Sequence, residues 1–197
     1  MALIAPADDA AVFLDKDGTL IEDVPFNVDP ERVRLAPGAG PALRTLVESG
    51  YRLVLVSNQP GVAYGLYDER DLSRVEERLG RALSPFGVSL DACLWCPHGP
   101  GDGCGCRKPA PGLLMRASSD LGIALERSWL VGDILDDVEA GRAASCRTVL
   151  LNVGSETEWN LTPGRIPDRV VPDLPSAARS IVARTPVQPL LMRRGAP

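Results

Sequence analysis

Residues 11–19 read Ala-Val-Phe-Leu-Asp-Lys-Asp-Gly-Thr, and this stretch decides how the rest of the chain is interpreted. A short apolar run that ends in charge and glycine predicts a buried strand over residues 11–15. Asp15 and Asp17 follow one residue apart at the carboxyl end of that strand, so their carboxylates are expected to project into one crevice. Gly18 lets the chain turn sharply there. A ligand or catalytic site is therefore predicted directly beyond the first strand.

Strand and helix patterns alternate along the rest of the chain. The further strands are predicted at 51–57, 92–95, 128–132 and 148–153, and the helices at 38–49, 68–84, 111–121 and 135–144. Residues 170–184 are expected to add a short edge strand and a last helix. This alternation predicts an α/β fold, a three-layer, Rossmann-like parallel sheet with helices on both faces. Asp15, Ser57 and Asp133 should then share the carboxyl edge of the sheet.

The loops between these elements stay within ordinary lengths, so we expect a single domain over residues 1–184 without an independent cap domain. The pocket should therefore be open and suited to small substrates. Residues 185–197 contain three prolines and Arg193-Arg194, a composition typical of a flexible C-terminal tail.

Composition narrows the classes of partner. The net charge of -5 and the pI near 5.0 argue against a protein that binds the nucleic-acid backbone, which needs a clustered basic face. No segment approaches the roughly 18 apolar residues that a membrane span needs. We therefore expect a cytoplasmic protein with no membrane or nucleic-acid partner. Because no heptad or exposed apolar stripe demands a second chain, we also expect a monomer.

Three further motifs stand at strand ends or just before a helix. Ser57-Asn58-Gln59 closes the second strand, Arg107-Lys108 precedes the third helix, and Gly132-Asp133 closes the fourth strand. Lys108 and Lys16 are the two lysines among 21 basic side chains, and a compact ammonium differs from a guanidinium when it must sit against a phosphate. Each motif alone is more typical of a turn, a helix cap or a surface charge. Their order and placement together favour catalysis.

These four motifs resemble those of the haloacid-dehalogenase-like phosphatases. The resemblance implies that Asp15 is the nucleophile, that Asp17 is the general acid and base, and that Ser57 with nearby backbone N–H groups holds the phosphoryl oxygens. It also implies that Lys108 neutralises the phosphoryl group. The chemistry is consistent, because a carboxylate is ionised at neutral pH and can attack phosphorus without an activating base.

Carboxylates cannot approach a phosphate dianion without charge compensation, so the site needs a divalent cation. The family resemblance implies Mg2+ held by Asp15, by the carbonyl group of Asp17 and by Asp133. Asp137 is a weaker candidate, for a position just outside the residues that bind the ion directly. The expected substrate is a small phosphorylated metabolite.

A second constellation combines thiols with the single histidine of the chain. Its members are Cys96, His98, Cys104 and Cys106. Three thiolates and one imidazole make a closed tetrahedral set, which is typical of structural Zn2+. The intervening residues 99–103 are too poor in apolar side chains to order the loop by burial. A zinc-binding loop over 96–106 is predicted, and the alternatives are free thiols or a disulfide.

The thiol loop narrows the resemblance, over residues 10–175, to the histidinol-phosphatase-like subgroup. Residues 23–35 and 61–65 resemble the subgroup's enzymes that remove the 7-phosphate of D-glycero-D-manno-heptose 1,7-bisphosphate, which favours a sugar bisphosphate substrate. The spacing of the thiol loop instead resembles the histidinol-phosphate phosphatases. Another small sugar phosphate is a further alternative, because Ile134 stands where many of the heptose enzymes have lysine. An alternative of another class is a zinc-stabilised binding module with an inactive site.

The side chains expected to bind substrate come from the first, second and third motifs and the loops beside them. They are Asp23, Val24, Pro25, Phe26, Ser57, Asn58, Gln59, Pro60, Arg107 and Lys108. Arg107 is included because a planar bidentate donor beside the reactive phosphate suits a second phosphate or a sugar hydroxyl.

Overall fold

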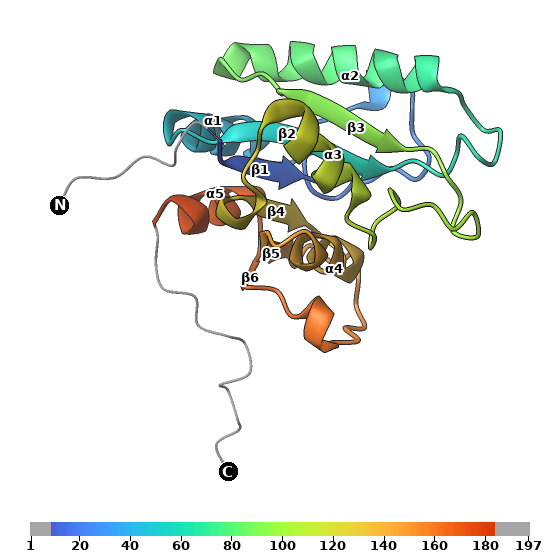
Figure 1. The fold of residues 1–197 in the computed structure, drawn as a ribbon. Coiled ribbons are helices and arrows are strands. Elements are labelled where there is room, and N and C mark those ends of the chain that lie inside the picture. The colour runs from blue at the N-terminus through green and yellow to red at the C-terminus, as the bar shows by residue number, and fades with distance from the viewer. Residues whose placement is uncertain (1–8, 184–197) are drawn as a thin grey trace.

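The structure, a computed structural model, describes residues 9–183 (Figure 1). Six parallel strands form one sheet in the order β3-β2-β1-β4-β5-β6. The strands are β1 (Ala11–Leu14), β2 (Arg52–Asn58), β3 (Ala92–Cys96), β4 (Trp129–Gly132), β5 (Arg147–Leu151) and β6 (Arg169–Val171). The α-helices are α1 (Ala39–Glu48), α2 (Glu69–Leu83), α3 (Gly112–Leu121), α4 (Leu135–Ala143) and α5 (Leu174–Val182).

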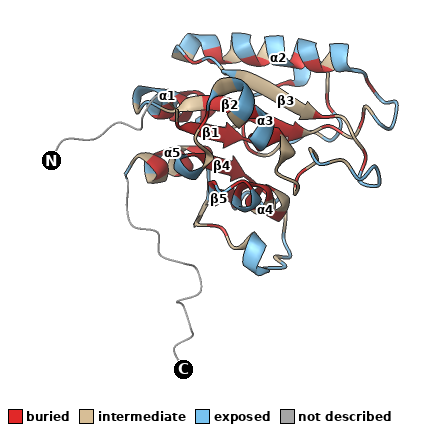
Figure 2. Cartoon of the chain, viewed as in Figure 1, coloured by how far each residue is buried: buried red, intermediate tan, exposed pale blue. Residues whose placement is uncertain are grey.

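Helices cover both faces of the sheet, which gives the three predicted layers (Figures 1 and 2). Val12 and Leu14 of β1 pack on one face with buried residues of α1, α2 and α5. Ala11 and Phe13 point to the other face, where α3 and α4 supply the core. All four side chains are fully buried, which is why this strand has a continuous apolar run instead of an alternating pattern. The core thus holds β1 at the centre of the molecule.

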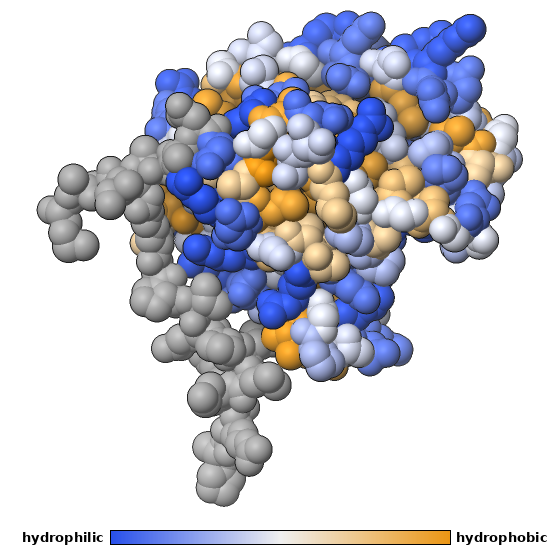
Figure 3. Space-filling view, in the orientation of Figure 1, coloured by the Kyte–Doolittle hydropathy of each residue, from blue (hydrophilic) through white to orange (hydrophobic). Residues whose placement is uncertain are grey.

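Strands and helices lie within one or two residues of their predicted positions. Helix α2 begins after Asp68, whose side chain caps the helix by accepting hydrogen bonds from the backbone N–H groups of Arg70 and Asp71. Hydrophilic side chains cover its outer face at the top of Figure 3. Four 3-10 turns, at Pro30–Arg32, Ser84–Phe86, Leu125–Arg127 and Pro163–Arg165, were not anticipated.

No segment of residues 9–183 forms a separate cap domain, as expected. The single-domain boundaries at 1–184 stay a prediction, and the predicted tail at 185–197 lies outside the described residues. Within the described part, none of the helices has the length and apolar character needed to cross a membrane.

Candidate active site

Side chains from four separate parts of the chain meet at the carboxyl edge of the sheet. Asp15 follows β1, Ser57 is near the end of β2, Lys108 precedes α3 and Asp133 follows β4. They line one pocket of about 260 Å³. The complete lining is Asp15, Asp17, Asp23, Ser57, Asn58, Lys108, Asp133, Ile134 and Ser155. The strand order places this pocket above β1, between the two halves of the sheet, where open α/β sheets bind ligands.

Lys108 is the central cation of the pocket and is almost fully buried. Its Nζ donates to Oδ1 of Asp15 at 2.5 Å and to the carbonyl oxygen of Val56 at 3.0 Å, and it lies 2.6 Å from Oδ1 of Asp137. Burial alone would lower the pKa of Lys108, but the negative charges of Asp137 and Asp15 outweigh burial and raise it. Lys108 therefore stays charged at neutral pH and fixes the carboxylate of Asp15.

Asn58 positions Lys108 through its backbone. Its Oδ1 accepts a hydrogen bond from the N–H group of Lys108 at 2.9 Å, and its Nδ2 donates to the carbonyl oxygen of Lys108 at 3.0 Å. Both ends of the Asn58 amide therefore contact one residue of the loop before α3. This side chain, which we expected to bind substrate, lines the pocket while holding the main chain of Lys108.

The carboxyl group of Asp17 has an unusual environment. Its Oδ2 accepts a hydrogen bond from Nε2 of Gln59 at 3.3 Å and lies 3.3 Å from Nζ of Lys16, whereas its buried Oδ1 has no hydrogen-bond partner. Burial raises the pKa of Asp17 to about 6, with Lys16 lowering it and Asp15 raising it. A carboxyl group with a pKa near neutrality can both give and take a proton, which a general acid and base requires.

Gln59 links the predicted phosphoryl-binding hydroxyl to the acid. Besides Asp17, Nε2 of Gln59 donates to Oγ of Ser57 at 2.9 Å, and Oε1 accepts from the hydroxyl group of Tyr67 at 2.7 Å. Gln59 is 3% exposed, so it acts from behind Ser57 and does not line the pocket. Its hydrogen bonds fix the relative positions of Ser57 and Asp17.

Three buried carboxylates form a cluster at the pocket. Oxygen atoms of Asp15, Asp133 and Asp137 lie within 4.8 Å of one another. Burial and the nearby charge of Asp15 raise the pKa of Asp133 to about 6. A Cβ at Gly18 would lie 2.1 Å from Oδ2 of Asp133, so glycine is required for the turn to approach this carboxylate. Buried carboxylates this close repel one another, and oxygen ligands of this kind suit Mg2+.

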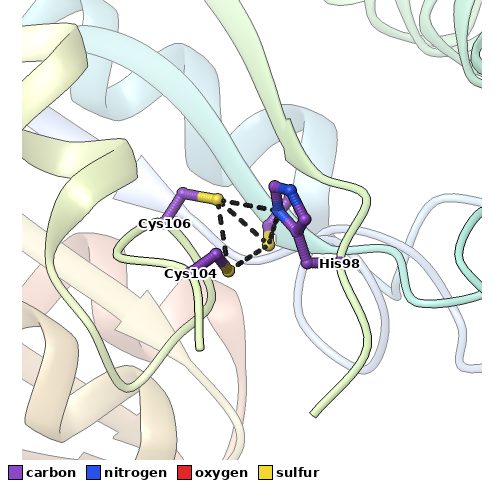
Figure 4. Close-up of side chains that lie close together, drawn as sticks. His98, Cys104 and Cys106 are labelled. Atoms are coloured by element: carbon purple, nitrogen blue, oxygen red, sulfur yellow. Dashed lines mark hydrogen bonds between the residues drawn. The ribbon is translucent and has the colours of Figure 1, made fainter. Parts of the chain in front are cut away.

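The cysteine and histidine side chains of the thiol loop form a compact cluster (Figure 4). The Sγ–Sγ distances among Cys96, Cys104 and Cys106 are 3.3, 3.5 and 3.7 Å, and Nδ1 of His98 lies 3.5 Å from Sγ of Cys96 and 3.3 Å from Sγ of Cys106. All three thiols are free. Sulfur atoms bonded to one zinc ion at about 2.3 Å lie roughly 3.8 Å apart, whereas a disulfide needs about 2.05 Å. The cluster therefore has the size of a metal site.

The metal-sized cluster is joined directly to the pocket. Cys106 precedes Arg107 and Lys108, and Arg107 donates a hydrogen bond to the carbonyl oxygen of His98 at 3.3 Å. The N–H group of Gly112, the first residue of α3, donates to the carbonyl oxygen of Gly105 at 3.0 Å. Arg107 and Lys108, together with Asp136, also line a neighbouring cavity of about 360 Å³. An ordered thiol loop thus determines where Lys108 enters the pocket.

The remaining predicted substrate residues divide into two groups. Asp23 lines the pocket, and Arg107 lines the neighbouring cavity. Val24, Pro25, Phe26 and Pro60 are absent from the lining of both cavities. The sequence interpretation missed Ser155, which lies beyond β5 and joins the lining. The sequence did offer one indication, because Ser155 lies four residues past β5, a strand that ends at the same edge of the sheet.

Comparison with known proteins gives consistent matches. A family model described as HAD-hydrolase-like matches residues 105–177. The D-glycero-beta-D-manno-heptose-1,7-bisphosphate 7-phosphatase of Bordetella bronchiseptica is 34% identical over 174 residues, which cover 87% of this chain and 97% of the relative. The protein of the same name from Haemophilus ducreyi is 40% identical over 148 residues, which cover 72% of this chain and 81% of the relative.

A solved structure matches almost the whole of the described fold. The crystal structure of D,D-heptose 1,7-bisphosphate phosphatase from B. bronchiseptica, complexed with magnesium and phosphate, has a TM-score of 0.80 and 33% sequence identity. The match covers 89% of this chain and 99% of that chain. The resemblance therefore extends beyond short motifs to the complete arrangement of strands and helices.

Proposed function

The chain belongs to the haloacid-dehalogenase-like phosphatases, and we propose that it removes the 7-phosphate of D-glycero-D-manno-heptose 1,7-bisphosphate. The catalytic part of this proposal is supported most directly by the contact between Asp15 and the buried ammonium of Lys108. Asp17 lines the same pocket. A carboxylate held at 2.5 Å by a permanent cation is both ionised and fixed in direction. These are the two properties that a nucleophile at phosphorus needs.

Catalysis then proceeds by two displacements at phosphorus. A carboxylate oxygen of Asp15 attacks the phosphorus atom, and the bond between phosphorus and the sugar oxygen breaks as Asp17 gives its proton to that oxygen. The product of this step is the sugar alcohol and an aspartyl-phosphate. Asp17 next takes a proton from water, the water oxygen attacks phosphorus, and the bond from phosphorus to Asp15 breaks, releasing inorganic phosphate.

The carboxylate cluster fits Mg2+. We assign Asp15 and Asp133, together with the carbonyl group of Asp17, to hold the ion, which would neutralise charge on the phosphoryl oxygens. Asp137 is close enough to join them, but its ion pair with Lys108 favours a role in holding that ammonium. The magnesium and phosphate in the related crystal structure support this assignment.

We assign a structural Zn2+ to Cys96, His98, Cys104 and Cys106, because the four side chains supply a closed set at metal-binding distances. A site built from free thiolates is typical of a reducing compartment, and this supports a cytoplasmic location. The zinc would leave no open position for catalysis. Its contribution is to order the loop that carries Arg107 and Lys108.

The substrate assignment rests on the similar proteins, whose names specify the heptose bisphosphate, and on the lining of the pocket. Asp23 and Ser155 offer oxygen atoms to sugar hydroxyls, and Arg107 in the adjacent cavity offers a guanidinium to a second phosphate. Ile134 contributes an apolar side chain beside Asp133. The partner is thus a small phosphorylated sugar.

The first experiment measures phosphate release with and without Mg2+, in the wild-type protein and in Asp15→Asn. We expect turnover that depends on Mg2+ and falls by at least about 10³-fold in the variant, because the amide cannot form the aspartyl-phosphate. Glu48→Gln, on the outer end of α1, serves as the matched control. Wild-type turnover in Asp15→Asn would rule out the nucleophile, and no phosphate release from the wild-type protein would favour the binding module.

A substrate panel tests the rest of the proposal. The panel compares kcat/KM for both anomers of the heptose bisphosphate, for histidinol phosphate and for several sugar monophosphates. We expect the heptose bisphosphate to give the highest value. A higher value for histidinol phosphate would replace the assigned substrate while leaving the catalytic assignment in place.

A further inference from the structure

Helix α4 begins two residues after Asp133 and has no capping side chain of its own. Ile134 occupies the cap position with an extended backbone (φ -128°, ψ 161°), and its side chain has no atom that accepts a hydrogen bond. The acids of the first turn, Asp136 and Asp137, form ion pairs with basic side chains instead. The first N–H groups of an α-helix have no partner within the helix. Any side-chain cap for α4 therefore comes from another part of the chain.

Glu156 supplies this cap. Its Oε2 accepts a hydrogen bond from the N–H group of Leu135, the first residue of α4, at 2.6 Å. Glu156 belongs to the β5–β6 loop, residues 152–168, and is 21 residues away from Leu135 along the chain. A hydrogen bond from an N–H group to a carboxylate is stronger than one to a neutral oxygen, and a negative charge is stabilised at the amino end of a helix. The bond thus ties the β5–β6 loop to the start of α4.

Trp159 holds Glu156 against the same helix. Nε1 of Trp159 donates to the carbonyl oxygen of Glu156 at 3.1 Å. The Trp159 ring packs on a small buried cluster that includes Leu135 and Val138 of α4. The backbone of Glu156 is therefore anchored to the helix that its side chain caps.

Arg165 attaches the far end of the β5–β6 loop to α4, and Figure 1 shows this loop running beside the helix. Nε of Arg165 donates to Oε2 of Glu139, and Nη2 donates to Oδ1 of Asp136, both at 2.7 Å. The loop is thus fastened to α4 on both sides of Trp159. These attachments fix the position of Glu156 relative to the start of the helix.

The start of α4 in turn determines where Asp133 lies. A two-residue link that contains Asp133 joins β4 to α4, and the sheet already holds β4 between β1 and β5. With Leu135 held by Glu156, both ends of the link are fixed. The neighbouring Ser155 reaches the same place, because a Cβ at Gly18 would lie 3.1 Å from Oγ of Ser155 and 2.1 Å from Oδ2 of Asp133.

We propose that Glu156 is a positioning residue for the Mg2+ site, because it caps α4 and thereby holds Asp133 in the orientation that binds the ion. A carboxylate that is already oriented loses less conformational freedom when the ion binds. Glu156 is absent from the lining of the pocket, so it acts through the start of α4 and not by contact with the ester. The proposal rests on the proposed phosphatase function and deepens it, because it names a residue that supports the metal site.

The first test measures Kd for Mg2+ by calorimetry, without substrate, in the wild type, Glu156→Ala and Glu156→Gln. Removal of the acceptor in Glu156→Ala should raise Kd about 10-fold, as the loss of a residue that orients a metal ligand typically does. Glu156→Gln keeps a side-chain oxygen that can accept from Leu135, so its Kd should stay within about 3-fold of the wild type. An unchanged Kd in Glu156→Ala, or an equal rise in both variants, would overturn the proposal.

Asp173→Ala is the matched control. Asp173 caps α5 in the same way, by accepting a hydrogen bond from the N–H group of Ser176 at 2.7 Å, and α5 supplies no residue to the pocket. Both alanine variants should unfold at a lower urea concentration than the wild type, but only Glu156→Ala should bind Mg2+ more weakly. Equal weakening in Asp173→Ala would show that loss of any helix cap loosens the site, which contradicts a specific role of Glu156.

Steady-state kinetics separates positioning from contact with the substrate. In Glu156→Ala the Mg2+ concentration for half-maximal turnover should rise about 10-fold, whereas kcat and KM for the ester at saturating Mg2+ should stay within about 3-fold of the wild type. A larger rise in KM at saturating Mg2+ would show that Glu156 contacts the ester, and the positioning role would be wrong.

Hydrogen exchange in the wild-type protein provides a test that does not require Glu156→Ala to fold. N–H groups of a first helical turn usually exchange quickly, because they lack partners within the helix. The Leu135 amide should instead exchange at least about 10-fold more slowly than that of Asp136, the next residue of the turn. Equally fast exchange of both would refute the cap. Because calorimetry and exchange need no turnover, an inactive wild-type protein with the expected Mg2+ and exchange results would refute only the phosphatase function.

Discussion

Lys108 joins the carboxylates of Asp15 and Asp137, and all three side chains are largely buried. Replacing it by methionine leaves both acids buried without their cation, so we expect Lys108→Met to lower the free energy of unfolding by about 3–5 kcal/mol. Urea unfolding of the metal-free protein at pH 7.5 measures this. Adding Asp137→Asn to the same variant should recover part of the loss. A single variant as stable as the wild type would show that the ion pairs contribute nothing.

Asp133 should make the stability of the metal-free protein depend on pH. Its pKa in the folded protein is raised to about 6, above the roughly 3.9 of an unfolded chain, so the folded state binds the proton more tightly. Its contribution is therefore complete below pH 4 and is lost as the pH rises through about 6. We expect Asp133→Asn to be more stable than the wild type at pH 8 by roughly 2 kcal/mol and to show no such gain at pH 4.

Urea midpoints at both pH values, with chelator or with Mg2+, test this expectation. Mg2+ should stabilise the wild type and leave Asp133→Asn nearly unchanged, because the variant lacks a ligand. In the wild type the hydroxyl group of Thr19 donates a hydrogen bond to Oδ1 of Asp133, and in Asp133→Asn it can still donate to the side-chain amide oxygen at this position. Loss of this hydrogen bond therefore cannot explain a difference in stability between the two proteins. If Asp133→Asn is less stable than the wild type at pH 8 in the presence of chelator, the negative charge of Asp133 does not destabilise the metal-free protein.

Sequence alone could place the principal site residues but not their contacts. Asp15, Ser57 and Asp133 follow buried strands, and parallel strands bring such positions to one edge, so their convergence was predictable. The sequence did not allow us to predict the hydrogen bond between Gln59 and Ser57 or the ion pair between Lys108 and Asp137. Those contacts depend on the course of loops and on rotamers, which hydrophobic periodicity does not encode.

The thiol loop should depend on its metal for order. Residues 97–105 contribute little to either core, so removal of zinc should release the segment and expose the peptide bond after Arg107 to trypsin. We expect cleavage there to accelerate by at least about 10-fold after chelation, and equally in Cys104→Ser without chelator. Mass spectrometry identifies the site, and metal analysis should find one zinc ion per chain. Cys93→Ser, a thiol outside the cluster, is the control.

If a strong chelator removes zinc but leaves the rate of trypsin cleavage after Arg107 unchanged, backbone hydrogen bonds already order this loop. A purified, stably folded protein without zinc would refute the metal assignment itself. Mg2+ is added back in every sample, so that loss of the second metal cannot account for the result.

The strands and helices were predictable because each has a core to fill. A strand buried on both faces needs an uninterrupted apolar run, and α2 needs apolar residues at helical spacing, such as Leu72, Val75 and Leu79. The short 3-10 turns carry no such periodicity. At Pro30–Arg32 the turn is closed by local hydrogen bonds, among them one from the N–H group of Glu31 to the side chain of Asp29 and one from the N–H group of Arg32 to the carbonyl oxygen of Asp29. Local bonds of this kind leave little trace in a hydrophobic pattern.

The single-domain prediction implies cooperative unfolding. Trp95 lies on β3 and Trp129 on β4, on opposite sides of the central strand, so tryptophan fluorescence reports on both halves of the sheet. We expect the fluorescence and far-ultraviolet circular dichroism curves in urea to coincide. Separate transitions would show that the two halves unfold independently.

The chain is also predicted to be a monomer. Sedimentation equilibrium should give a mass close to 21.0 kDa across the micromolar range. A concentration-dependent rise in mass would contradict this and would direct attention to the exposed edge of β3. The sequence could not decide the point, because association depends on how surface residues are arranged in space, and those residues come from many elements.

The described chain enters and leaves the fold at the end of the sheet remote from the pocket. Asp9 precedes β1, and α5 returns from β6 toward the amino edge, as Figure 1 shows. Both ends of the described fold, at Asp9 and at Ala183, therefore lie on the side away from the pocket, which leaves the opening of the pocket free for small esters to diffuse to Asp15.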